Sequence, residues 1–172
     1  GWLAGLVFYG ILLYWIPAVP AHYGGLSAGL SFLIYLLLIL FLGLFWAVFA
    51  SVSARIRQSY PHLIFVLLPF IWVAFEYAVT HFLTGFPWGL LGSSQIKNIY
   101  LIQIASITGV YGISFALVLF QSLFLASIKS RSRSPFIFAL GFILLVHAFG
   151  YWSVKQIPPN SRSFRGAVIQ GN

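Results

Sequence analysis

Five long apolar segments follow one another along the chain, separated by short stretches that hold most of the charged residues and prolines. A helix that crosses a bilayer needs about 20 mostly apolar residues, and these segments reach or approach that length. The pattern therefore predicts an all-α, polytopic transmembrane bundle of about five spans. The predicted spans are Trp2–Ile16, Ala28–Ser51, His62–Leu83, Ile99–Ile128 and Pro135–Val154.

Prolines and glycines mark where the predicted helices begin, end or bend. Pro17 and Pro20 follow the first segment, and Pro61 stands at the start of the third, where its missing N–H costs little. Gly109 and Gly112 lie inside the fourth segment. Glycines inside a membrane helix indicate a kink or a close contact with another helix, so we expect one of these features there.

The composition favours a membrane protein over a soluble domain. The 172 residues are 61% hydrophobic and only 6% charged, with a mean hydropathy of +1.01. Soluble domains carry about 25% charged residues. The net charge of +8 would suit nucleic acid, but the few basic residues fall at the ends of apolar segments, where membrane topology explains them. We therefore expect the lipid bilayer as a partner, and no nucleic acid.

The basic residues between the spans are concentrated in two loops, after the second and the fourth predicted helix. They are Arg55, Arg57, Lys129, Arg131 and Arg133. The loop after the third helix carries only Lys97, and the loop after the first carries no charge. Basic loops favour the cytoplasmic side. We therefore expect the loop after the third helix, and the C-terminal end of the chain, on the outer side.

The last residues differ in character from the apolar segments. Residues 155–163 are polar and contain prolines, which predicts a linker after a membrane domain of residues 1–154. Residues 164–172 include Ala167-Val168-Ile169, a run typical of a buried strand. Because a lone strand is not stable, we interpret 164–172 as the start of a further domain on the outer side. The chain lacks methionine, including at position 1, so we expect it to be a piece of a longer protein.

Few side chains suited to catalysis or metal binding are present. The chain has no cysteine, which excludes disulfides, thiolate metal sites and a cysteine nucleophile within these residues. The histidines fall on different segments without metal-ligand spacing, and each is interpreted as an interfacial or packed residue. They are His22, His62, His81 and His147. We therefore expect no metal and no cofactor.

Glu76 is the only acidic residue, and it lies inside the third predicted span. A charge at that depth costs several kcal/mol. One interpretation is a hydrogen-bonded glutamic acid that ties its helix to a neighbour, with Thr80 one turn further on the same face. The other is a proton relay or a polar contact below a catalytic pocket. No second acid or lysine is available in the spans as a partner, which disfavours a proton-coupled pump.

The third predicted span is followed by Gly85-Phe86-Pro87-Trp88. Glycine and proline break a helix at the membrane surface, and tryptophan is enriched in the interfacial aromatic belt. These residues alone therefore predict a helix end with an aromatic anchor.

Several motifs together resemble the membrane domain of bacterial apolipoprotein N-acyltransferases, and the resemblance extends over nearly the whole chain. The most specific are Glu76-Tyr77, Gly85-Phe86-Pro87-Trp88 and Gly92-Ser93-Ser94-Gln95, and the supporting ones are Tyr14-Trp15, Tyr23-Gly24-Gly25, Gly109–Phe115 and the residues RGAVIQGN at 165–172. The last motif is similar to the first strand of that family's α/β nitrilase-like domain.

The resemblance implies an enzyme that moves an acyl chain from a membrane phospholipid to the N-terminal amine of a diacylglyceryl-cysteine apolipoprotein. It implies a multi-pass protein of the bacterial inner membrane, with its Glu-Lys-Cys triad in the nitrilase-like domain, and hence no catalytic residue in this chain. Trp88, with Phe86, Pro87 and Gly85, is then expected to contact or dock the substrate. Glu76 and Gln95 are expected to be structural polar residues, and this chain alone is expected to be inactive.

One residue departs from the family pattern, and other functions stay open. The family often has arginine where this chain has Val79, and His81 is expected to project from a different face than Glu76. One alternative is a non-enzymatic polytopic membrane protein, such as a transporter subunit or scaffold. Another keeps the same architecture but uses the membrane part for a different partner.

Overall fold

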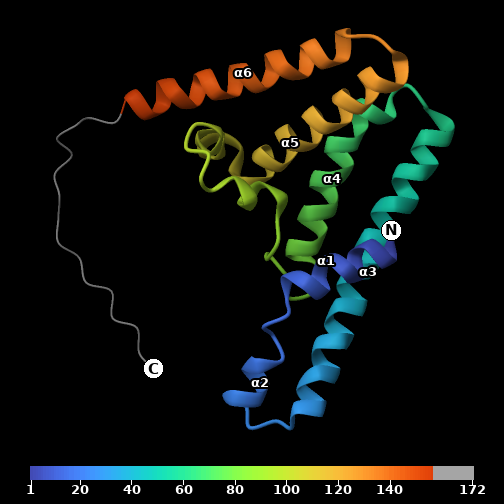
Figure 1. Ribbon diagram of the computed structural model, residues 1–172, viewed down its shortest axis with the longest axis vertical. Helices are drawn as coiled ribbons and strands as arrows, with labels where there is room; N and C mark the ends of the chain where they lie inside the picture. Colours follow the sequence, from blue (N-terminus) through green and yellow to red (C-terminus); the bar gives the residue numbers. More distant parts are fainter. Residues whose placement is uncertain (157–172) are drawn as a thin grey trace.

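The computed structural model describes residues 1–156, which form a fan of α-helices (Figure 1). In chain order the elements are α1 (Trp2–Leu12), α2 (Ala18–His22), α3 (Ala28–Ser59), α4 (Ile64–His81), the 3-10 helices η1 (Leu91–Gln95) and η2 (Leu101–Ile104), α5 (Ala105–Ser130) and α6 (Ser134–Lys155). Among the described residues, α3, α4, the segment Leu101–Ser130 and α6 are long and apolar enough to cross a membrane. The predicted all-α membrane fold is confirmed, and the protein is a multi-pass membrane protein. Apart from Lys155 and Gln156, the predicted linker and strand lie outside the described residues.

The first predicted span is shorter than expected. The sequence predicted a helix over Trp2–Ile16, but α1 has 11 residues and ends at Leu12. At 1.5 Å per residue it is about 16 Å long, roughly half the thickness of the hydrocarbon core. The reason is Pro17, whose ring disfavours helix at the preceding residue and clashes with the carbonyl four positions earlier. Residues 13–17 instead form turns, in which the Ile16 N–H donates to the Leu13 carbonyl at 2.9 Å.

The second and third spans have the predicted order but different ends. Helix α3 has 32 residues and continues eight residues past the predicted end at Ser51, so Arg55 and Arg57 lie on the helix. It ends just before Pro61, as a helix that meets a proline usually does. Helix α4 begins at Ile64 and continues through Pro69 to His81.

The fourth predicted span begins with a short 3-10 helix rather than as a regular α-helix. Helix η2 occupies Leu101–Ile104 and leads directly into α5. Inside α5, Gly109 has φ 65° and ψ −170°, which breaks the helical path. The kink predicted at this glycine is therefore present.

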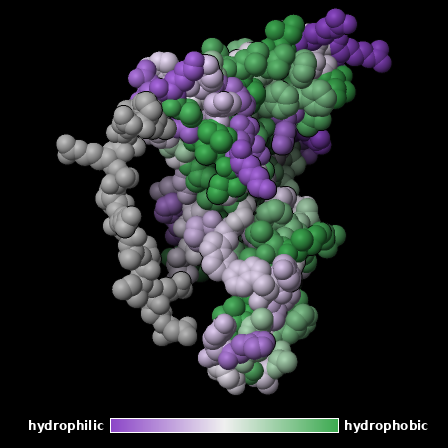
Figure 2. Space-filling view, turned by 60° about the vertical axis from the view of Figure 1, so that its left-hand side comes forward, coloured by the Kyte–Doolittle hydropathy of each residue, from purple (hydrophilic) through white to green (hydrophobic). Residues whose placement is uncertain are grey.

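Three separate groups of buried side chains hold the helices together. One joins the end of α1 to α3 and α4, and consists of Tyr9, Leu13, Ile39, Leu42 and Val79. A second joins η2, α5 and α6, and consists of Leu101, Ile113 and Val146. A third joins α5 to α6, and consists of Leu119, Leu123 and Ala139. Many large apolar side chains are exposed instead, and Figure 2 shows wide hydrophobic areas on the face in view. Such surface fits a helix bundle whose solvent is lipid.

The turn that follows Arg55 and Arg57 of α3 lies beside the basic turn that follows α5, although the two are far apart in the sequence. The turn between α3 and α4 and the turn between α5 and α6 meet at the upper right of Figure 1. The Lys129 ammonium lies 5.8 Å from the ring centre of Phe65. This contact joins the end of α5 to the start of α4. The Gly85–Trp88 turn follows the opposite end of α4.

Candidate functional site

The turn after α4 is shaped by Gly85. The Gly85 N–H donates to the Phe82 carbonyl at 3.0 Å, and the Phe86 N–H donates to the Val79 carbonyl at 2.8 Å. Gly85 has a φ of +74°, and a Cβ there would overlap the Thr80 carbonyl oxygen. Because both the φ and the space require glycine, this position reverses the chain sharply and directs it back along α4.

Glu76 holds the returning loop against the helix bundle. Its Oε1 accepts a hydrogen bond from the Leu91 N–H at 2.7 Å, and the Glu76 side chain is only 3% exposed. Next along the chain, the Gly92 N–H donates to the hydroxyl of buried Ser114 on α5 at 2.8 Å. Two backbone donors that would otherwise be unpaired inside a membrane protein are thus satisfied by side chains of α4 and α5.

A second group of hydrogen bonds surrounds Thr80. Its hydroxyl lies 2.6 Å from the Tyr111 hydroxyl of α5 and 3.0 Å from the Glu76 backbone carbonyl. His81 Nδ1 lies 2.9 Å from the Tyr77 carbonyl, and the His81 ring stacks on Tyr77 with ring centres 4.0 Å apart. His81 therefore bonds its own helix, and the partner of the Glu76 carboxyl group is the loop.

The position where the family often has arginine belongs to the core. Val79 is 4% exposed and packs in the group that joins α1, α3 and α4. The carboxyl group of Glu76 has a backbone N–H as its partner, so its burial does not depend on a cation at this position.

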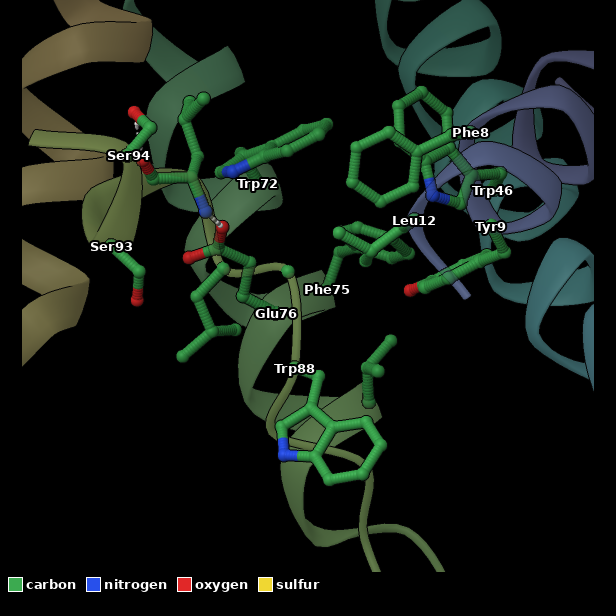
Figure 3. Close-up of a pocket in the computed structure, with 14 residues that line it drawn as sticks. Phe8, Tyr9, Leu12, Trp46, Trp72, Phe75, Glu76, Trp88, Ser93 and Ser94 are labelled. Atoms are coloured by element: carbon green, nitrogen blue, oxygen red, sulfur yellow. Dashed lines mark hydrogen bonds between the residues drawn. The ribbon is translucent and has the colours of Figure 1, made fainter. Parts of the chain in front are cut away.

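A cavity of about 450 Å³ lies between α1, α3, α4 and the loop that follows Trp88 (Figure 3). Its wall is dominated by aromatic rings, those of Phe8, Tyr9, Trp46, Trp72, Phe75 and Trp88. Glu76 and the hydroxyl-bearing Ser93 and Ser94 are the polar side chains that also line it. A mostly apolar hollow of this size with a few polar groups has the character of a small-molecule binding site.

The structure brings two of the six predicted site residues to this cavity, Trp88 and Glu76. The Trp88 ring is 49% exposed and packs against Trp15 and Phe86, with ring centres 5.1 and 5.2 Å away. Phe86 is partly buried behind it against Tyr9, at 6.3 Å between ring centres. Phe86 therefore supports Trp88 from the core side.

The other three predicted residues lie elsewhere. Gly85 lines a smaller hollow between the middle of α3 and the end of α4, together with Phe86. Pro87 is exposed and is not among the residues that line the cavity. Gln95 donates to the Ser94 hydroxyl at 3.1 Å and lines a separate groove beside His147 of α6.

Residues of the cavity wall that the sequence analysis did not identify follow a helical pattern around Glu76. Trp72 lies four residues before Glu76, Phe75 one residue before it, and Val79 three residues after it. This spacing places the three side chains on one side of α4. That spacing could have identified them. Phe8 and Trp46 come from α1 and α3, and no local signal links them to this site.

Fold and site together define a class, a multi-pass helical membrane protein with an aromatic cavity beside the turn that ends α4. Comparison with known proteins assigns the chain to one family within this class. Residues 1–123 match the family model described as apolipoprotein N-acyltransferase N-terminal domain. The chain belongs to this family.

Similar proteins carry the same name in distant bacteria. The whole chain aligns with proteins named apolipoprotein N-acyltransferase from Geobacter metallireducens at 35% identity, Coxiella burnetii at 33% and Pseudomonas syringae pv. tomato at 35%. The chain spans 34%, 36% and 35% of these relatives, about a third of their length.

Proposed function

We propose that this chain is the membrane part of an acyltransferase that moves an acyl chain from a phospholipid to the N-terminal amine of an apolipoprotein. Family membership supports this reaction over a non-enzymatic transporter subunit or scaffold. The chain has no cysteine. The proposal therefore places the thioester-forming nucleophile, which this class of covalent catalysis needs, outside these residues.

The observation that carries the proposal is the aromatic cavity. Its wall offers apolar rings and almost no charge, which suits the hydrocarbon chain of a lipid. Trp88 forms part of the wall and is half exposed, so its ring can touch a bound chain and also a partner outside the cavity. The proposed role of Trp88 is to position the acyl chain or the incoming lipoprotein, with Phe86 as its support.

The proposed orientation places the Gly85–Trp88 turn on the outer side of the bacterial inner membrane. It is supported by the basic residues near the ends of α3 and α5, which lie together at the other end of α4. The turn and its cavity then face the outer compartment.

The test is Trp88→Ala in the full-length protein. Loss of the ring opens the cavity wall, and a misplacement of about 1 Å can cost on the order of a hundredfold in rate. We expect folded protein with strongly reduced transfer of labelled acyl chains to an apolipoprotein. Trp152→Ala is the matched control, because Trp152 is exposed on α6 and does not line the cavity. Equal, near-normal rates for both variants would refute the role of Trp88.

A further inference from the structure

A second hollow lies between the start of α4 and the end of α5, at the opposite end of α4 from the Gly85–Trp88 turn. Its volume is about 180 Å³, and its lining residues are Pro61, His62, Phe65, Ala126, Lys129 and Ser130. It shares no lining residue with the aromatic cavity. A water molecule occupies about 30 Å³ in the liquid, so the hollow has room for a group of the size of a phosphate.

The hollow lies at the level where lipid headgroups meet the hydrocarbon core. Helix α4 begins at Ile64 and α5 ends at Ser130, and both belong to segments that are long and apolar enough to cross a membrane. The ends of such helices reach the headgroup region. Next to lining residues of the hollow, Val66 and Leu125 are exposed, as expected for apolar side chains that contact lipid tails. A lipid could therefore place its headgroup in the hollow and its chains along the two helices.

Three polar side chains of the hollow can donate hydrogen bonds. The Lys129 ammonium has three N–H donors and no acceptor, and the His62 ring carries at least one N–H. The Ser130 hydroxyl oxygen accepts from the Ser132 N–H at 3.3 Å, which leaves the hydroxyl proton of Ser130 free to donate. A ligand that satisfies these groups must supply several acceptors.

The charge at this end of α4 restricts the ligand further. Glu76 is the only acidic residue of the chain. It lies about 18 Å beyond Ile64 along the helix axis, which is about twice the Debye length at physiological salt. Arg131 and Arg133 add positive charge in the turn after α5. No acid of this chain balances Lys129, so the hollow favours an anion, and the ammonium of a zwitterionic headgroup would meet only cations.

The turn beside the hollow is held by its own hydrogen bonds. The Ser127 hydroxyl donates to the Ser132 carbonyl at 2.6 Å, and Arg131 ends α5 in the left-handed conformation, with φ 53°. The Lys129 ammonium lies 5.8 Å from the ring centre of Phe65. Because these contacts already restrain the turn and the cation, less conformational freedom is lost when a ligand binds.

We propose that His62, Lys129 and Ser130 bind the phosphate of an anionic phospholipid, whose chains extend along α4 and α5. Membrane topology explains why basic residues are frequent at this end, but it does not explain why donors from two helices line one hollow. Basic pockets between membrane helices bind phospholipid headgroups. The lipid would join the start of α4 to the end of α5, where the two turns meet (Figure 1). This inference goes beyond the proposed function and does not depend on it, because the bound lipid is not the acyl donor.

The test compares phosphatidylglycerol with phosphatidylethanolamine of the same chains, added to the full-length protein in a neutral detergent. Bound lipid is counted by mass spectrometry of the intact protein. We expect phosphatidylglycerol to bind at least about fivefold tighter, the contribution of one basic residue near a membrane surface. The aromatic cavity has no lysine, arginine or histidine in its wall, so this preference reports on the hollow. Equal binding of the two lipids overturns the proposal, and no variant is needed for this comparison.

Two variants with the same change of charge distinguish a built site from diffuse attraction. Lys129→Gln removes a charged donor that lines the hollow, and the affinity for phosphatidylglycerol should fall by about tenfold or more. Arg133→Gln, in the same turn but outside the lining, is the matched control and should lower it by about fivefold at most. Lys129→Arg keeps the charge and should retain most of the affinity. Equal losses in Lys129→Gln and Arg133→Gln would show diffuse attraction and overturn the site.

Two further measurements identify the source of the phosphate and the place where it binds. Inorganic phosphate at millimolar concentration should not displace phosphatidylglycerol, and displacement would identify a site for free anions instead of a lipid site. Trp88→Ala should keep the preference for phosphatidylglycerol, because Trp88 does not line the hollow. Loss of the preference in this variant would place the lipid in the aromatic cavity and overturn the assignment. Failure of the acyl-transfer test leaves this site standing, and failure of this site leaves the proposed function standing.

Discussion

Replacement of Glu76 by leucine should release the loop that closes the cavity. In the structure the Glu76 Oε1 accepts a hydrogen bond from the Leu91 N–H at 2.7 Å, and the Glu76 side chain is buried. Leucine fills a similar volume but cannot accept, so Glu76→Leu leaves the Leu91 N–H without a partner. A buried donor that loses its acceptor costs about 1–3 kcal/mol.

Glu76→Gln is the matched control, because its amide oxygen can accept the same N–H at the same place. We therefore expect the free energy of unfolding to fall by about 1–3 kcal/mol in the leucine variant, and by clearly less in the glutamine variant. The free energy is measured by denaturation in mixed micelles. Amide hydrogen exchange over residues 85–95 follows the loop itself, and only the leucine variant should lose protection there.

Two outcomes would refute this reasoning. If both variants lose the same stability, the oxygen that accepts the Leu91 N–H is not what matters at this position. If Glu76→Leu retains full stability and full protection of the loop, the hydrogen bond to Leu91 does not hold the loop.

Two further predictions concern the turn and the topology. Gly89 has a φ of +84°, and a Cβ there would overlap the side chain of Leu12. Gly89→Ala should therefore lower the free energy of unfolding by about 1–2 kcal/mol from the backbone alone. The control is Gly141→Ala on α6, where no atom lies within 4 Å of an added Cβ, and it should be neutral or stabilising by up to about 1 kcal/mol. Reporter fusions within residues 93–98 should report the outer side and fusions near Arg57 and Ser132 the cytoplasm, and the reverse result would contradict the proposed orientation.

The fold could be predicted in outline because membrane helices are set by length and hydropathy. The order of the helices, the kink at Gly109 and the helix end before Gly85 all follow from apolar runs and from prolines and glycines. The predicted ends of α1 and α3 were wrong by several residues. Hydropathy cannot distinguish the end of α1 from apolar residues in a turn before a proline. It also cannot show that α3 continues as a helix through polar and basic residues.

The candidate site could be predicted only in part. Trp88 and Glu76 stand out in the sequence, one through its turn motif and the other as the single acid. The contact between Glu76 and Leu91 joins residues 15 positions apart through a reversed loop, and the cavity also needs α1 and α3. Packing between distant segments produces no periodic pattern in the sequence, so Phe8 and Trp46 could not be assigned to the site in advance.

The central claim is that the aromatic cavity holds the acyl chain, and photo-crosslinking tests it most directly. The probe is an ester-linked phosphatidylglycerol with a diazirine on one acyl chain, added to the full-length protein in detergent, and the adducts are located by peptide mass spectrometry. The account predicts adducts at Phe8, Leu12 and Trp46 that disappear with excess unlabelled lipid. Adducts confined to exposed apolar positions such as Leu144 and Leu145 of α6, with none in the cavity, would contradict it.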